Sequence, residues 1–151
     1  MESCSGSDTM INNKEMLQSM HRTTRTAQTG LRAVLKTSME PELKSALVSQ
    51  LREYDSIGEE VKALEMRRGI QVPRSHSALQ NMIERMTRLK LGKKERSYRI
   101  ANMIIQGNTQ GMIVSLRDRH QYAGKDLEVK ELNKKLIYTE IENIRQMKPF
   151  L

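Results

Sequence analysis

Residues 100–116, IANMIIQGNTQGMIVSL, form the longest uncharged stretch of a chain in which 29% of the residues are charged. The flanks are apolar, but residues 106–111 combine two glycines with four amide or hydroxyl side chains. A glycine inside a helix costs about 1 kcal/mol relative to alanine. Gly107 and Gly111 are one turn apart and therefore share a helix face. We expect this face to admit a neighbouring helix at close range, as we do for Gly30 and Gly58. The alternative is that these glycines have no role in packing and are only tolerated in the helices.

The amides of the stretch predict a polar layer inside a pair of helices. If the chain turns back at Gly124, residues at similar distances on either side of it lie level, which sets Gln106 near Asn143 and Asn108 near Glu140. The candidate polar pocket consists of Asn102, Gln106, Glu140 and Asn143. Buried amides need hydrogen bonds, and such a layer fixes helix register at some cost in stability. A register layer is one interpretation, and a pocket for a small ligand or a metal is the other.

Helical periodicity dominates the rest of the chain, and no run of alternating β-branched residues indicates a strand. We expect long helices over about 12–38, 41–69, 94–122 and 127–148, and a short one over 77–91. Asn12 with Glu15 and Ser77 with Gln80 are capping-box patterns. The expected apolar face of the last helix holds Leu132, Leu136, Ile137, Ile141, Ile144 and Met147. The pattern predicts an all-α protein, an antiparallel four-helix bundle of two long hairpins with a short basic crossover helix.

The length of 151 residues is typical of one domain. We expect residues 1–10 to be a disordered tail and residues 11–151 to be a single helical-bundle domain. Cys4 is the only cysteine, which favours a reducing cytosol and a cytoplasmic location. Residues 1–9 lack the features of a signal peptide. Glycines and amides inside residues 100–116 argue against a membrane span, so none is expected.

The net charge of +8 is concentrated in one segment. Between Met66 and Ile100 the chain has ten basic residues and two acidic ones, Glu84 and Glu95. The basic residues are Arg67, Arg68, Arg74, Arg85, Arg88, Lys90, Lys93, Lys94, Arg96 and Arg99. Such a set can neutralise phosphates, but Tyr98 is the only aromatic residue in the segment that could stack on a base. Weak binding to nucleic acid or to an anionic surface is one hypothesis, and a solvated basic surface is the other.

Paired helical hairpins with polar residues at mid-length resemble the ferritin-like superfamily. Residues 43–69 and 97–151 also look like a family of small uncharacterised bacterial helical proteins. The similar parts are Tyr54-x-x-Ile57 leading to Gly69, Ile100-Ala101-x-Met103-x-Ile105-Gln106-Gly107, and Asn143-Ile144-x-x-Met147-Lys148. This resemblance implies a ferritin-like bundle of unknown role.

The di-metal members of the superfamily place Glu-x-x-His on one helix of each pair, because carboxylates and imidazoles must converge on two cations. Here His21, His76 and His120 do not fall at that spacing after any Glu. Where the bacterial family is expected to have His-Ile-Ala-Glu, this chain has Arg99-Ile100-Ala101-Asn102. The sequence therefore predicts no metal site and no cofactor.

No nucleophile–base pair, phosphate loop or Cys/His metal set is recognisable in the sequence. The leading hypothesis is a non-catalytic helical bundle with a structural or interaction role, acting as a homo-oligomer or with a protein partner. One alternative is a degenerate pocket for a metal or a small ligand. The other is weak binding of nucleic acid or an anionic surface through the basic segment described above. His21 falls level with Gly58 if the first hairpin turns near residue 39, so a histidine tuned by its surroundings is a further possibility.

Overall fold

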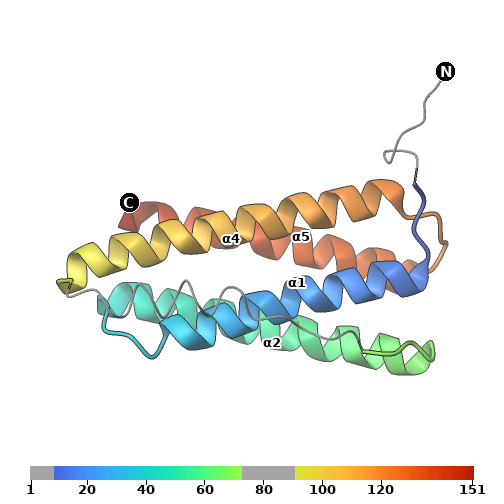
Figure 1. Cartoon of the computed structure of the whole chain (residues 1–151), viewed down its shortest axis with the longest axis horizontal. Coiled ribbons are helices and arrows are strands. Elements are labelled where there is room, and N and C mark those ends of the chain that lie inside the picture. The colour runs from blue at the N-terminus through green and yellow to red at the C-terminus, as the bar shows by residue number, and fades with distance from the viewer. Residues whose placement is uncertain (1–8, 73–90) are drawn as a thin grey trace, which may run out of the picture.

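The computed structural model describes residues 9–72 and 91–151, and Figure 1 shows them as an elongated set of parallel and antiparallel rods. Four α-helices make up this part of the chain: α1 (Asn13–Val34), α2 (Pro41–Arg67), α4 (Lys93–Gln121) and α5 (Leu127–Met147). A short 3-10 helix, η2 (Lys148–Phe150), follows α5. The described residues form no strand, and their one β contact is an isolated bridge between Ile11 and Tyr122. The all-α prediction is confirmed.

Local signals explain where the helices begin and end. Asn12 accepts a hydrogen bond from the Glu15 backbone N–H, and the Glu15 carboxylate accepts one from the Asn12 backbone N–H, so the predicted capping box is present. Pro41 occupies the first turn of α2, where its missing N–H costs nothing. The chain leaves α2 at Gly69, whose φ of 65° suits glycine. Asp126 caps α5 by accepting from the Val129 N–H.

The helices form two antiparallel hairpins, α1 with α2 and α4 with α5 (Figure 1). Because α2 and α4 run in the same direction, the end of α2 and the start of α4 lie at opposite ends of the molecule. The connection between them consists of residues 68–92. Most of it, residues 73–90, lies outside the described residues. The predicted short helix over 77–91 falls almost entirely there, and residues 1–8 of the predicted tail are outside as well.

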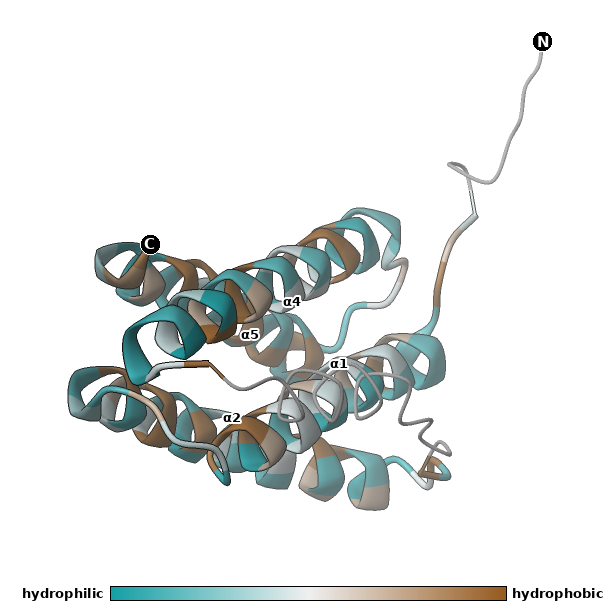
Figure 2. Cartoon of the chain, turned by 60° about the vertical axis from the view of Figure 1, so that its left-hand side comes forward, coloured by the Kyte–Doolittle hydropathy of each residue, from teal (hydrophilic) through white to brown (hydrophobic). Residues whose placement is uncertain are grey.

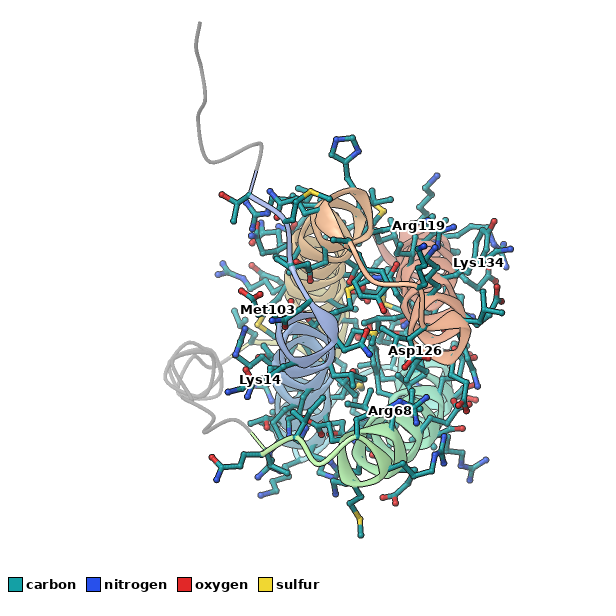
Figure 3. All side chains as sticks on the ribbon, turned by 90° about the vertical axis from the view of Figure 1, so that its right-hand side faces the viewer. Lys14, Arg68, Met103, Arg119, Asp126 and Lys134 are labelled. Carbon is teal, nitrogen blue, oxygen red and sulfur yellow. The ribbon has the colours of Figure 1, made fainter. Side chains whose placement is uncertain are left out.

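Polar contacts join the two hairpins at both ends. At one end the Ile11 N–H donates to the Gln121 carbonyl at 2.9 Å, and the Ala123 N–H donates to the Ile11 carbonyl at 3.0 Å. At the same end Arg68 donates to Asp126, and Figure 3 shows these two residues at the end facing the viewer. At the other end the Glu40 N–H donates to Ser97 Oγ at 2.9 Å. The hairpins are thus held together beyond their apolar contacts.

The core lies between the four helices, and each helix contributes an apolar stripe (Figure 2). Met16, Leu47, Ile57, Ile100 and Leu136 are among its fully buried side chains. Methionine fills core positions on several elements, as expected in a chain with eleven methionines and one phenylalanine.

The predicted apolar face of α5 needs one correction. Ile141 is 46% exposed, whereas its neighbour Glu140 is 1% exposed. One residue corresponds to about 100° around a helix. The inward face of α5, set by Leu136 and Asn143, therefore includes Glu140 and turns Ile141 outward. A carboxyl group lies inside the bundle at a point where the apolar pattern predicted an isoleucine.

Candidate functional site

A groove of about 780 Å³ lies between α1 and α4, where the two hairpins meet. Its walls include the apolar side chains of Ala27 and Leu31 from α1 and of Met103, Ile104 and Val114 from α4. Figure 3 shows Lys14 of α1 and Met103 of α4 on the same side of the bundle. Polar side chains from the other two helices also reach the groove: Gln50, Tyr54 and Glu140. The combination of apolar walls with a few polar groups is typical of small-molecule sites.

Gly111 makes room for the Glu140 carboxyl group. A Cβ atom at position 111 would overlap Glu140 Oε2 and would lie 3.2 Å from Thr23 Cγ2. The predicted close approach is therefore present at Gly111, although a side chain of the neighbouring helix fills the space. Gly58 is similar, because a Cβ there would lie 3.0 Å from Gln28 Nε2 of α1.

The same prediction is wrong for Gly107. Nothing lies within 4 Å of a Cβ built at that position, and the residue is exposed. Gly107 and Gly111 do share the groove side of α4, but only Gly111 is covered by a neighbouring helix. The glycines of the opening stretch therefore have different surroundings despite their spacing.

Among the residues that the structure describes, Ser115 is the hydrogen-bond donor to Glu140. The Ser115 hydroxyl donates to Glu140 Oε1 at 3.3 Å, and no cation of residues 9–72 or 91–151 is paired with the carboxylate. Burial without a countercharge disfavours the ionised form. It raises the pKa of Glu140 from 4.5 to about 8, although the Ser115 hydrogen bond opposes the shift. The carboxyl is therefore mostly protonated at neutral pH.

Tyr54 and Asn108 form the second polar pair beside the groove. The buried Tyr54 hydroxyl donates to Asn108 Oδ1 at 2.6 Å, and Asn108 Nδ2 donates to the Ile104 carbonyl at 2.9 Å. Burial raises the pKa of Tyr54, and the nearby Glu140 adds to this rise. Tyr54 therefore stays a neutral hydrogen-bond donor, and both polar ends of Asn108 are occupied.

Three buried amides near Glu140 keep unpaired atoms. Gln50 Nε2 donates to Gln146 Oε1 at 3.0 Å, and Asn133 Nδ2 donates to the Ser115 carbonyl at 3.1 Å. These bonds fix both amides and leave Gln50 Oε1 and Asn133 Oδ1 without a donor. Asn143 is fully buried and lies beside the Tyr54 hydroxyl, but neither atom of its amide has a partner with good hydrogen-bond geometry. Buried polar atoms of this kind are costly, so each calls for an explanation.

The predicted polar pocket is brought together only in part. Glu140 and Asn143 lie inside the bundle, one turn apart on α5. Asn102 and Gln106 are exposed on α4, where Gln106 Nε2 donates to Asn102 Oδ1 at 3.4 Å. They do not line the groove, because the inward face of α4 is set by Ala101, Asn108 and Ser115. The turn at Gly124 correctly predicts which residues of α4 and α5 lie at the same height in the bundle. It does not predict how α4 is rotated about its own axis.

The predicted basic set does not form one patch in the described part of the chain. Arg67 and Arg68 lie at the end of α2, and both bind Glu128 of α5. Lys93, Lys94, Arg96 and Arg99 lie at the start of α4, at the opposite end of the molecule. Arg99 is 3.4 Å from Glu95. The remaining members, Arg74, Arg85, Arg88 and Lys90, are outside the described residues.

His21 lies in a separate polar site between α1 and α2. Its Nδ1 atom is 2.8 Å from Glu65 Oε1, and the two side chains are 6% and 1% exposed. Gly58 borders a small cavity beside His21, as expected from the estimated turn. The partner Glu65 was not predicted, although it lies one residue beyond Leu64 in the apolar pattern of α2. In residues 9–72 and 91–151, no three His, Cys, Asp or Glu side chains are grouped so as to hold a metal ion.

Sequence reasoning also missed Gln50, Tyr54, Ser115 and Asn133 as parts of the polar layer. Tyr54 was placed on the apolar face of its helix, and its hydroxyl carried no separate signal. Asn133 is as far beyond the turn at Gly124 as Ser115 is before it, so the register did contain a signal for this pair.

Known proteins provide a likeness in fold. No family model matches the chain, and no curated protein matches it significantly. Solved structures that match the chain include the following two. A DUF305 fragment from Deinococcus radiodurans has a TM-score of 0.74 and 13% identity, over 98% of this chain and 97% of that one. A conserved hypothetical protein, rv2844, from Mycobacterium tuberculosis has a TM-score of 0.67 and 9% identity, over 89% and 87%. At these identities the likeness concerns the fold alone.

Among the described helices, none has the length and apolar character that a membrane span requires.

Leucine substitutions at the two glycines should have opposite effects on stability. Gly111→Leu should lower the free energy of unfolding by about 1–3 kcal/mol, because the new side chain overlaps Glu140. Gly107→Leu meets open space and should raise it by up to about 1 kcal/mol through helix propensity. Urea unfolding of both variants measures the difference. Equal effects at the two positions would show that Gly111 does not lie against Glu140.

The raised pKa of Glu140 predicts a particular pH dependence of stability. The folded state holds this proton up to about pH 8, whereas the unfolded state releases it near 4.5. Raising the pH through this range therefore lowers the free energy of unfolding, by at most about 1.4 kcal/mol per pH unit. Glu140→Gln should remove this contribution, as measured by urea unfolding at pH 5, 6.5 and 8.

The exposed Glu131 on the same helix provides the control, and Glu131→Gln should keep the wild-type pH dependence. If Glu140→Gln and the wild type changed in parallel with pH, Glu140 would titrate normally in the folded protein.

Proposed function

We propose that this chain is a non-catalytic helical-bundle protein that binds a small ligand in the groove between α1 and α4. The observation that carries the proposal is the buried carboxyl of Glu140, which reaches the groove beside Gly111. A bundle that needed only a packed interior would gain more from an apolar side chain at this position. A ligand that contacts the carboxyl provides a reason for both the buried acid and the glycine.

The described polar groups favour binding over catalysis. The hydroxyls of Ser19 and Ser115 donate to carboxylates, Asp118 and Glu140 respectively, and neither is bonded to a histidine. The buried His21 is paired with Glu65 in another part of the bundle. A nucleophile activated by a base requires a hydrogen bond between the two groups. These contacts support a role in which no covalent bond changes.

The finer features of the fold are part of the same proposal. Two antiparallel hairpins joined lengthwise are the arrangement of ferritin-like bundles. We therefore propose that the bundle is ferritin-like and that the connection between α2 and α4 contains a short basic crossover helix. We also propose that the protein is bacterial, that it is located in the cytoplasm and that it has no metal centre. Binding of nucleic acid remains the weaker alternative, because Arg67 and Arg68 are already paired with α5.

Self-association is a second prediction within this function. Ile113 and Leu116 of α4 and Ile141 of α5 are each nearly half exposed, on the antiparallel pair of helices. Exposed large apolar side chains can mark surfaces for association. Native mass spectrometry should detect a dimer that Ile113→Glu dissociates. Lys94→Glu, an exposed change near the other end of the same helix, should leave the dimer intact. A monomeric wild-type protein at micromolar concentration would rule this prediction out.

The ligand-binding proposal can be tested with a neutral probe. In a proton–nitrogen NMR titration, 1-hexanol should cause saturable shifts of the backbone amides of Ala27, Met103 and Gly107, which line the groove. Ala27→Phe should abolish these shifts by filling the space between the walls. Ala33→Phe changes another half-buried alanine of α1, one that lies away from the groove, and should leave them unchanged.

Absence of saturable shifts in the wild type would contradict the proposed function. The groove would then be filled by another part of the chain or by ordered water.

A further inference from the structure

Gln50, Tyr54, Asn108 and Glu140 form the polar floor of the groove. This floor has more free hydrogen-bond acceptors than free donors. The side-chain donors of Tyr54, Asn108 and Gln50 are used internally: the Tyr54 O–H by Asn108, the Asn108 amide by the Ile104 carbonyl, and the Gln50 amide by Gln146. Gln50 Oε1 is without a donor, although the residue is 1% exposed and lines the groove. A ligand that satisfies such a floor must bring hydrogen-bond donors.

The next layer of the bundle has the same imbalance. Asn133 Oδ1 and Asn143 Oδ1 are unpaired, and Asn143 Nδ2 is the one unpaired side-chain amide donor among the buried residues described. Asn143 lies one turn from Glu140 on the inward face of α5, and its backbone carbonyl accepts from Gln50 Nε2 at 3.4 Å. The surroundings of Glu140 are therefore rich in oxygen atoms.

We infer that the groove binds a small alkyl amine, with its ammonium group against the Glu140 carboxylate and Gln50 Oε1, and its hydrocarbon part along the apolar wall. This inference rests on the proposed ligand-binding function and specifies the class of ligand. An ammonium group supplies three donors and a positive charge to a buried acid that has no cationic partner among the described residues. The wall formed by Ala27, Leu31, Met103, Ile104 and Val114 suits the hydrocarbon part.

The charges at the rim of the groove do not oppose a cation. Arg22 and Arg117 lie there together with Glu15 and Asp118, so the two signs are balanced. Asp118 already accepts from the Ser19 hydroxyl. From α2, Tyr54 is the titratable group beside Glu140, and its raised pKa keeps it neutral. Glu140 is therefore the acid that lacks a countercharge at the floor.

Binding of the amine must be coupled to the release of a proton. The empty site holds Glu140 mostly as the neutral acid at pH 7, since burial raises its pKa to about 8. An alkylammonium ion that pairs with the carboxylate displaces this proton to the solvent. The ion keeps its own proton throughout, because alkyl amines titrate well above this range. Affinity should therefore rise about tenfold per pH unit below pH 8 and level off above it.

The test compares three probes of equal length, hexylamine, 1-hexanol and hexanoate, by NMR titration of the full chain at pH 7.5. Hexylamine should bind at least tenfold more tightly than either of the others. Glu140→Gln should remove this preference by lowering the affinity for hexylamine at least tenfold. Glu15→Gln changes an acid at the rim and preserves the capping-box pattern, so it should keep the preference for the amine.

Each other outcome overturns the inference in a recognisable way. If 1-hexanol or hexanoate binds as tightly as hexylamine, the groove binds ligands but is not selective for amines. If Glu15→Gln removes the preference and Glu140→Gln does not, the amine binds at the rim. If none of the three probes causes saturable shifts, the proposed function fails together with the inference.

Discussion

The carboxyl group of Glu140 sets the main physical constraint on this bundle. A carboxylate taken out of water without a cation costs far more than one hydrogen bond returns, so the group remains protonated over the neutral range. Even the neutral acid needs space and a partner. Gly111 provides the space on the facing helix, and Ser115 provides the hydrogen bond one turn further along. The glycine of the uncharged stretch and the acid of α5 are parts of one arrangement.

The two hairpins hold this arrangement open toward the groove. Backbone hydrogen bonds of Ile11 join the start of α1 to the end of α4, and Ser97 joins the opposite end to Glu40. Between these ties the facing sides of α1 and α4 carry small residues, among them Ala27, Gly107 and Gly111. Small side chains leave open the space between α1 and α4 that bulky residues would fill. The groove thus results from end contacts that fix the helices and from residues that do not fill the gap between them.

Most of the fold was predictable from local signals. The capping box at Asn12, Pro41 at the start of α2 and Gly69 after its end all act within a few residues, so they can be recognised without tertiary information. The register of α4 against α5 was also predictable, because a short turn near Gly124 places Asn133 level with Ser115.

The rotation of each helix about its own axis was harder to predict. Gln106 lies at nearly the expected level, but it is two residues from the inward Asn108, or about 200° around the helix, and therefore faces solvent. Glu140 was correctly predicted inside the bundle, but Ile141 was wrongly placed on the apolar face as well, because hydrophobicity favours the isoleucine whereas the packing of α5 turns it outward. A buried polar layer contradicts the apolar pattern from which rotation is inferred. Sequence patterns are therefore least informative at the polar layer that forms the candidate site.

The protonation state of Glu140 tests this account most directly. Carbon-13 NMR of protein labelled at the glutamate side-chain carboxyls, with Glu140→Gln to assign the signal, follows this one group through a pH titration. A buried Glu140 without a countercharge should give a midpoint near pH 8 in the ligand-free protein. A midpoint near the ordinary value of 4.5 would show that the carboxyl is solvated or paired, and would contradict the buried, uncompensated acid on which the account depends.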